Sequence, residues 1–180
     1  GSRAGERLRG ESRIGMTCAG EVPLGAGRAV RSARTKAIDE RSTAEVPTKF
    51  RELHDRCNEL EIAFRGDWAL RMRVYDNGVA YRFETSRKGD AVVVDETAEF
   101  NFAADNDTYW TRERNPDFTS HCEAFFERKR LSEPARSVYA FLPVYFATPQ
   151  GTRLVLPESG PHDYPRLFPF RGQATPPHAE

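Results

Sequence analysis

The sequence predicts a mostly β protein built as an antiparallel β-sandwich. Apolar and polar residues alternate along residues 69–75 and 79–85, which is the period of a β-strand. The dipeptide Asn77-Gly78 lies between the two runs and is typical of a tight turn between paired strands. Further short apolar runs, separated by turn residues, continue to about residue 157. This spacing is typical of a sandwich of short strands.

The two alternating runs predict one β-hairpin whose register is set by its turn. A two-residue type I′ turn at residues 77–78 places Val74 opposite Tyr81. The same register pairs Met72 with Phe83, so that the apolar side chains share one face of the hairpin. On the other face, the expected pairs are Arg71 with Glu84 and Arg73 with Arg82.

Residues 1–46 are predicted to be disordered or foreign to the fold. Arginine, alanine, glycine and serine dominate this segment, and no apolar period is sustained along it. Such a segment cannot bury enough apolar surface to offset the entropy cost of ordering it. It also lacks the apolar core of a secretory signal peptide. We therefore expect the folded domain over residues 47–172 and a loose tail over residues 173–180.

Other strands are expected on both sides of the hairpin. Before it, residues 58–64 alternate and predict a strand. After it, strands are predicted at 91–95, 99–102, 138–147 and 152–157. Pro143 favours an edge strand or a bulge at its position. Two segments stay open: residues 49–55 are a candidate helix, and residues 121–130 fit a helix or a strand.

Charge and composition limit the classes of partner that the sequence predicts. The 27 lysines and arginines balance the 27 aspartates and glutamates, so net charge gives no attraction to nucleic acid or to an anionic membrane surface. No run of about 18 apolar residues occurs, so no transmembrane helix is expected. Cys18, Cys57 and Cys122 lie far apart without a C-x-x-C pair and give no zinc signature.

The residues alone identify no catalytic group. Asp105-Asn106-Asp107 begins like a calcium loop, but the glycine at its sixth position and the glutamate at its twelfth are absent. The four histidines show no ligand spacing, and no carboxylate pair stands out. Trp68, Tyr109 and Trp110 are candidates for stacking on a sugar ring, or alternatively for filling the core of the sandwich.

A longer pattern resembles a known family. The run from Arg73 to Phe83, RVYDNGVAYRF, is similar to the hairpin of the N-terminal domain of family 97 glycoside hydrolases. Other short matches stand on both sides of the hairpin, in the same order as in that family. They are Asn58-Glu59-Leu60 before it and, after it, Glu96-Thr97, Glu99-Phe100-Asn101-Phe102, Trp110, Pro157-Glu158-Ser159 and Asp163-Tyr164-Pro165. The resemblance covers about residues 50–172.

The resemblance implies a β-supersandwich, present here in part, that precedes a (β/α)8 barrel in calcium-dependent enzymes acting on α-glucosidic or α-galactosidic bonds. The catalytic carboxylates of the family belong to the barrel, so no catalytic residue is carried over and the chain is expected to be inactive by itself. One calcium ligand is carried over, Glu158, which needs further ligands from a barrel. Gly160 and Pro161 depart from the acidic and apolar residues usual in the family. The resemblance also implies a periplasmic or secreted protein.

Three function hypotheses follow. The first is a non-catalytic module that supports the barrel and its sugar and calcium site, with carbohydrate and the barrel as partners. The second is a free-standing carbohydrate-binding module that uses Trp68, Tyr109 or Trp110. The third is a scaffold fragment without activity.

Overall fold

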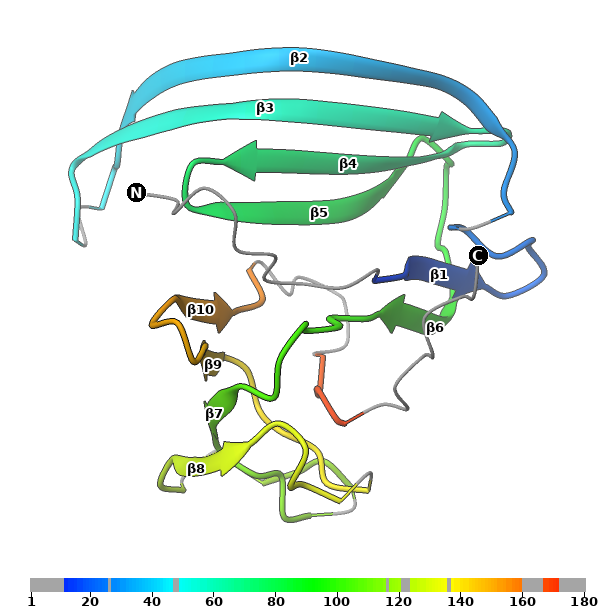
Figure 1. Ribbon diagram of the computed structural model, residues 1–180. Coiled ribbons are helices and arrows are strands. Elements are labelled where there is room, and N and C mark those ends of the chain that lie inside the picture. Colours follow the sequence, from blue (N-terminus) through cyan, green and yellow to red (C-terminus); the bar gives the residue numbers. More distant parts are fainter. Residues whose placement is uncertain are drawn as a thin grey trace. The chain divides into compact units, whose positions relative to one another are not determined.

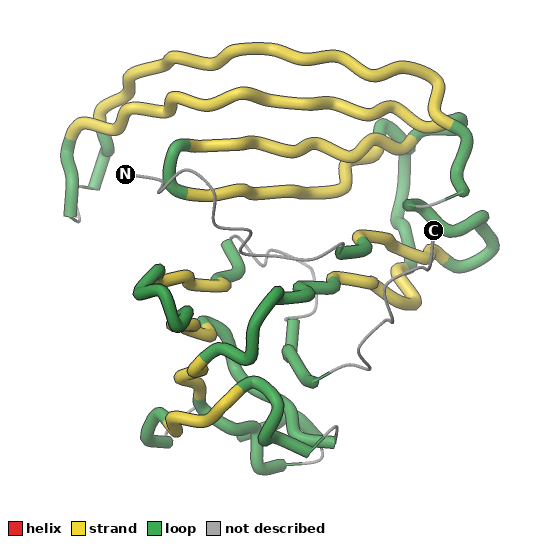
Figure 2. Tube along the Cα trace, viewed as in Figure 1, coloured by secondary structure: helices red, strands yellow, loops and turns green. Residues whose placement is uncertain are grey.

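A computed structural model describes residues 12–25, 27–46, 49–115, 117–120, 124–135, 137–159 and 167–171. These residues form ten β-strands and no helix (Figure 1, Figure 2), which confirms the predicted mostly β, antiparallel fold. The described part of the chain holds no helix of the length and apolar character that crossing a membrane requires. The chain divides into two compact units, one with residues 12–99 and one with residues 100 onward. Each unit is described by itself.

The first unit contains a four-stranded antiparallel sheet and a two-stranded one. The strands of the larger sheet are β2 (Val30–Thr43), β3 (Glu52–Phe64), β4 (Trp68–Tyr75) and β5 (Gly78–Thr85), in the order β2-β3-β4-β5. The long strands β2 and β3 pair with each other along their length (Figure 1). The smaller sheet pairs β1 (Ile14–Cys18) with β6 (Val93–Ala98).

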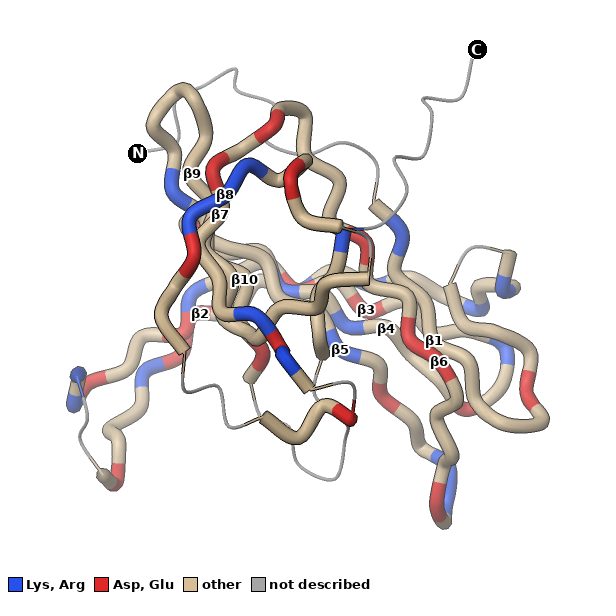
Figure 3. Tube along the Cα trace, turned by 90° about the horizontal axis from the view of Figure 1, so that it is seen from below, with Lys and Arg blue, Asp and Glu red and all other residues tan. Residues whose placement is uncertain are grey.

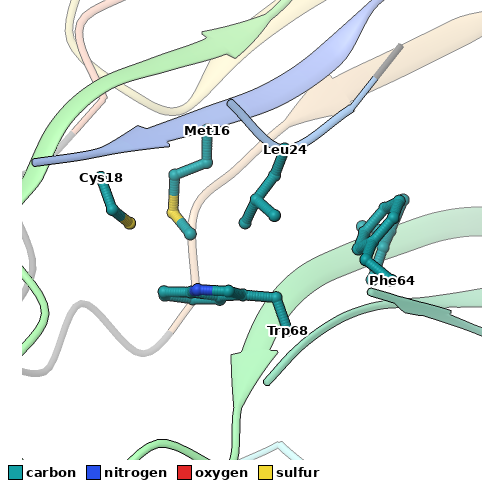
Figure 4. Packing of buried hydrophobic residues seen from close by; sticks show 6 residues of the cluster. Met16, Cys18, Leu24, Phe64 and Trp68 are labelled. Carbon is teal, nitrogen blue, oxygen red and sulfur yellow. The ribbon is translucent and has the colours of Figure 1, made fainter. Parts of the chain in front are cut away.

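The core of the first unit lies between these two sheets. Met16, Cys18 and Leu24, from β1 and the loop after it, are buried against Phe64 and Trp68 of the larger sheet (Figure 4). Leu70 is also a buried member of this cluster, and partly buried apolar residues pack around it: Ile62, Met72, Tyr81, Phe83, Ala91 and Val93. Because burial of such side chains is the main favourable term in folding, this contact holds the two layers together.

The prediction that residues 1–46 are disordered is wrong for β1 and β2. Strand β1 supplies Met16 and Cys18 to the core, and β2 is hydrogen-bonded to β3 from Val30 to Thr43. Most side chains of β2 are exposed, and Ile38 is the buried one. Backbone pairing therefore holds this strand, and composition carries no signal of such pairing. The predicted boundary at residue 47 falls between β2 and β3, while the predicted tail at 173–180 lies outside the described residues.

The hairpin is present, but its register differs by two residues from the predicted one. Tyr75 pairs with Gly78, so that Asp76 and Asn77 form the turn. Neither turn residue has a positive φ, which excludes a type I′ turn. The observed pairs are Val74 with Val79, Met72 with Tyr81, Leu70 with Phe83, and Arg71 with Arg82. A shift of two residues leaves each side chain on its predicted face, because the period of a strand is two.

Three other local predictions are resolved by the structure. Residues 52–55 belong to β3, so the helical alternative for residues 49–55 is wrong there. Residues 127–130 form strand β8, while residues 121–123 lie outside the described part. The run at 138–147 is a strand only over its last four residues, and Pro143 stands just before it.

The second unit is built on a separate four-stranded antiparallel sheet of short strands. Its order is β10 (Arg153–Leu156), β9 (Val144–Ala147), β7 (Asp107–Trp110) and β8 (Glu127–Arg130). Trp110, Ala140, Val144 and Phe146 form its buried core, with Phe102, Leu131, Val138, Leu142, Leu154 and Leu156 packed around them.

In the first unit, a network of charged side chains lies on the face of β3, β4 and β5 that is opposite to the apolar core. Glu59 is only 5% exposed and is held between Arg71 and Arg73, with the Nε of Arg73 2.8 Å from Oε2 of Glu59. Arg71 also donates from Nε to Oε1 of Glu84 at 2.9 Å. Charged residues of both signs lie along these strands (Figure 3). The hydrogen bonds from Arg73 and Arg71 lower the pKa of Glu59, and those from Arg71 and Arg82 lower the pKa of Glu84.

The network predicts that acid destabilises the first unit. The pKa of Glu84 is lower in the folded chain than its ordinary value of 4.5, so its contribution to the free energy of unfolding is present above that value. It is lost as the pH falls through the lowered folded pKa. We expect the urea midpoint to fall less between about pH 7 and about pH 3 in Glu84→Gln than in the wild type. Equal losses in the two proteins would contradict this assignment.

A second prediction concerns the N-terminal strands. A chain that begins at residue 47 lacks β1 and β2, which leaves Trp68 without Met16 and Leu24 over it. We expect this shortened chain to lose the part of its near-ultraviolet circular dichroism that arises from Trp68 and the cooperative urea transition of the first unit, because the core of that unit is incomplete while the second unit keeps its own core. The matched control begins at Ser12 and keeps both strands. A cooperative urea transition of the first unit in the shorter chain would show that β1 and β2 are dispensable.

Candidate functional site around Glu158

A pocket of about 270 Å³ lies in the second unit at the end of β10. The chain leaves β10 at Leu156, and Pro157 and Glu158 follow as part of the pocket wall. The complete lining is Phe141, Leu142, Pro143, Pro157, Glu158, Leu167 and Phe168. The wall is therefore apolar except for one carboxylate and the backbone.

Glu158 is half-buried in this wall. Its Oε2 accepts a hydrogen bond from the backbone N–H of Leu167 at 3.3 Å, which is long for such a bond. No described lysine or arginine forms an ion pair with Glu158. A carboxylate in an apolar wall loses hydration and gains most from a nearby cation. The position thus suits a residue that contributes to a cation site.

The described residues do not complete a calcium site. Calcium takes about six to eight oxygen ligands, and one carboxylate supplies at most two. Among the described residues no group of three histidine, cysteine, aspartate or glutamate side chains is close enough to hold a metal ion. Asp163, which is close to Glu158 in the sequence, lies outside the described part. Glu158 can therefore act only as one ligand among others that these residues do not provide.

The structure corrects the expectation for the two tryptophans. Trp68 is 6% exposed in the core of the first unit, and its Nε1 donates to Oε2 of Glu21 at 2.8 Å. Trp110 is also 6% exposed, in the core of the second unit. Neither presents the exposed ring face that stacking on a sugar requires, so both fill cores, as in the alternative interpretation. Tyr109 is half-buried and lies edge-on to Tyr145 at 5.4 Å, and its sugar-binding role stays a prediction.

A cluster of aromatic rings beside the pocket is not evident from the sequence. We call it the aromatic rim and define it as Phe118, Tyr139, Phe141, Phe168 and Phe170. The centroid distances between its neighbouring rings run from 4.7 Å for Phe118 and Phe168 to 5.4 Å for Tyr139 and Phe170. Phe141 and Phe168 are also part of the pocket wall. A dense set of aromatics at residues 139–141 and 168–170 is the only trace of the rim in the sequence, and it does not reveal the contact with Phe118.

A tight loop presents Phe118 to this cluster. The buried Glu113 accepts the backbone N–H of Asn115 at 2.7 Å, and the carbonyl of Asn115 accepts that of Phe118 at 3.0 Å. Burial acts to raise the pKa of Glu113, but hydrogen bonds from Ser120 and nearby backbone amides outweigh it and lower that pKa. Phe118 has φ of 55°, a left-handed conformation that a bulky residue rarely adopts.

Comparison with known proteins identifies the family. The family model described as glycosyl-hydrolase 97 N-terminal matches residues 2–178. The chain belongs to this family. The match confirms the resemblance drawn from the hairpin, and it also includes β1 and β2.

Relatives of this family 97 N-terminal domain are much longer than the chain. A retaining α-galactosidase of Bacteroides thetaiotaomicron is 27% identical over 174 residues, which cover 91% of this chain and 26% of that protein. A solved family 97 glycoside hydrolase variant from Pseudoalteromonas sp. strain K8 has the same fold, with a TM-score of 0.67 and 16% identity. The enzyme of that strain solved in complex with acarbose gives a TM-score of 0.65 and the same identity. Both alignments cover 81% of this chain and 23% of the solved one, so the chain spans about a quarter of these relatives.

The burial of the tryptophans predicts the fluorescence of the domain. The chain has two tryptophans, and both are buried, so its emission reports on the two cores. We expect maltooligosaccharide to leave this emission unchanged and acrylamide to quench it weakly, because neither reaches the rings. N-acetyltryptophanamide and the urea-unfolded chain serve as controls for an exposed indole. Saturable quenching of the folded chain by sugar would contradict this prediction and would show that sugar binds at a tryptophan ring.

Proposed function

We propose that this chain is the non-catalytic N-terminal domain of a longer family 97 glycoside hydrolase that cleaves α-galactosidic or α-glucosidic bonds. In that enzyme it supports a catalytic barrel and closes one side of the sugar and calcium site. The observation that carries the proposal is the position of Glu158, a half-buried carboxylate at the apolar pocket of a domain that belongs to this family. The similarity to a retaining α-galactosidase supports the substrate class.

The pocket has too few carboxylates for catalysis. Hydrolysis of a glycosidic bond generally uses two carboxyl groups about 5 to 9.5 Å apart on either side of the bond. Glu158 is the one carboxylate among the described residues that line the pocket. A substrate bound near Glu158 therefore needs the catalytic pair from another part of the polypeptide, which supports a non-catalytic role for this domain.

Calcium enters the proposal as a shared site. Glu158 would supply one or two of the oxygen ligands, and the barrel would supply the others. When bound, a divalent cation stabilises negative charge that develops on nearby oxygens. The residues of this chain hold the Glu158 carboxylate in place through the Leu167 amide and keep the surrounding wall apolar. Carbohydrate and the barrel are accordingly the expected partners, and export to the periplasm or the medium stays a prediction of the family resemblance.

A free-standing sugar-binding module is the weaker candidate. That role needs exposed aromatic ring faces, and the structure buries Trp68 and Trp110. The shared calcium site requires no such face and explains why a carboxylate stands in an otherwise apolar wall.

The proposal is tested by enzyme assays on two proteins. The purified 180-residue chain should not hydrolyse nitrophenyl α-galactoside or α-glucoside above a boiled control, whereas a polypeptide that continues into a barrel should. In the longer protein, Glu158→Gln should raise the free calcium needed for half-maximal activity by about tenfold or more. Glu133→Gln is the matched control, since Glu133 is exposed in the same unit and does not line the pocket. Activity of the 180-residue chain, or an unchanged calcium requirement in Glu158→Gln, would overturn the proposal.

A further inference from the structure

The turn of the hairpin contains a reactive dipeptide. An asparagine side chain carries an electrophilic amide carbon within reach of the backbone nitrogen of the next residue. Glycine leaves that nitrogen the least hindered, because it has no Cβ. Asn77 is the one asparagine in the sequence that a glycine follows. Larger residues follow the other four, which are Asn58, Asn101, Asn106 and Asn115.

The structure leaves this dipeptide open to water. Asn77 and Gly78 are both exposed at the end of β4 and the start of β5. The side chain of Asn77 forms no hydrogen bond with any residue that the structure describes. A Cβ placed on Gly78 would meet no atom within 4 Å. Within the described part of the chain, nothing therefore blocks the approach of the Asn77 amide to the nitrogen of Gly78.

Few contacts hold the turn end of the hairpin. Among the described strands β5 is at the end of the sheet order, so Gly78 and Val79 pair only with Tyr75 and Val74 of β4. Val74 and Val79 are 49% and 53% exposed, and neither belongs to the apolar core cluster. Strand ends with so little burial open locally at a small fraction of the free energy of global unfolding. Such opening gives the dipeptide the freedom that a cyclisation needs.

Asn106 shows the opposite environment in the same chain. It is 1% exposed, and its carbonyl accepts the backbone N–H of Leu131 at 2.9 Å. The next residue, Asp107, belongs to β7 and pairs with strands on both sides. Its backbone is therefore fixed and shielded from water, which makes Asn106 an internal control for the exposed turn.

We propose that Asn77-Gly78 is a site of spontaneous deamidation in the folded domain, with water as the co-reactant. The backbone nitrogen of Gly78 attacks Cγ of Asn77 and closes a five-membered succinimide ring. The side-chain amide nitrogen leaves as ammonia, and it takes up the proton that the nitrogen of Gly78 loses. Water then cleaves one of the two carbon–nitrogen bonds of the ring. Cleavage at Cγ gives aspartate, and cleavage at the backbone carbonyl carbon gives isoaspartate.

Both products change the turn. Aspartate places a second carboxylate beside Asp76, and like charges at such short range repel each other. Isoaspartate routes the main chain through Cβ and Cγ and so adds one carbon between β4 and β5. The added carbon disturbs the pairing of Tyr75 with Gly78. We therefore expect isoaspartate to loosen the turn end of the hairpin and to leave the second unit unchanged.

Mass spectrometry of the 180-residue chain tests the modification. Trypsin releases residues 74–82 as one peptide, in which Asn77 is the one side-chain amide. Deamidation replaces NH2 by OH and raises the mass of this peptide by one unit, and an isoaspartate-specific methyltransferase labels the isoaspartate form. In mildly alkaline buffer we expect Asn77 of the folded chain to convert no more than about a hundredfold more slowly than the same synthetic peptide, because local opening costs little. The rate should rise with the hydroxide concentration.

Two outcomes of this experiment would overturn the proposal. One is an unmodified Asn77 in the folded chain under conditions that convert the free peptide. The other is conversion of the buried Asn106 as fast as that of Asn77, which would show that deamidation follows unfolding of the chain. Conversion of Asn77 while Asn106 stays intact supports a reaction in the folded domain.

The variant Gly78→Ala tests the nucleophile. Its methyl group crowds the attacking nitrogen, and the fold should tolerate it, since the position is open and its φ is not left-handed. We expect conversion of Asn77 to be about tenfold slower, which corresponds to a barrier higher by about 1.4 kcal/mol. Near-ultraviolet circular dichroism checks that the variant is folded. Conversion at the wild-type rate would show that the nitrogen of Gly78 is not the nucleophile and would overturn the mechanism.

Hydrogen exchange tests the effect on the hairpin. A sample rich in isoaspartate is compared with the fresh chain. We expect faster exchange within residues 74–82 and equal exchange in β7, which is the internal control in the second unit. Equal exchange of residues 74–82 in the two samples would contradict the loosening of the turn.

Discussion

The structure of the first unit depends on how Trp68 is enclosed. Its indole ring stands at the start of β4 and is covered by Met16 and Cys18 of β1 and by Leu24 of the loop after it (Figure 4). Its Nε1 bonds Glu21, whose other oxygen is paired with Arg87 beyond the end of β5. One side chain thus joins the two layers and fixes the segments that enter and leave the hairpin. A large aromatic ring combines extensive apolar burial with one directional hydrogen bond, which makes it suited to this position.

The hairpin shows what an alternating pattern determines and what it leaves open. Its faces could be predicted, because the period of two assigns each side chain to a face whatever the register. The register could not, because residues 76–78, Asp-Asn-Gly, allow a two-residue turn at either of two places. Strand β2 was missed altogether, since its pairing with β3 uses backbone groups that every sequence has, and its side chains are mostly exposed. Strand β2 can be recognised only together with its partner β3, and β3 begins after residue 46, outside the segment whose composition predicted disorder.

Some residues of the candidate site could likewise be predicted from the sequence and others could not. Glu158 could be found because it lies in a short motif that the family resemblance covers, and the structure adds the pocket around it. The aromatic rim could not be found, since it joins residues near 118, 140 and 169 that have no common sequence pattern. Trp68 and Trp110 were ambiguous from the sequence because an aromatic residue serves a core and a sugar site equally well, and only burial distinguishes the two uses.

The composition of β2 has a consequence for the solubility of the domain. Among the described strands, this strand of fourteen residues stands at the end of the sheet order, so a row of its backbone groups faces away from β3. A long apolar strand in that place would recruit further strands and seed aggregates. Six of the fourteen residues are charged instead, among them Arg31, Lys36 and Asp39, and approach of a second edge would force their desolvation. The same polar residues that conceal β2 in the sequence keep the sheet from growing into the sheets of neighbouring molecules.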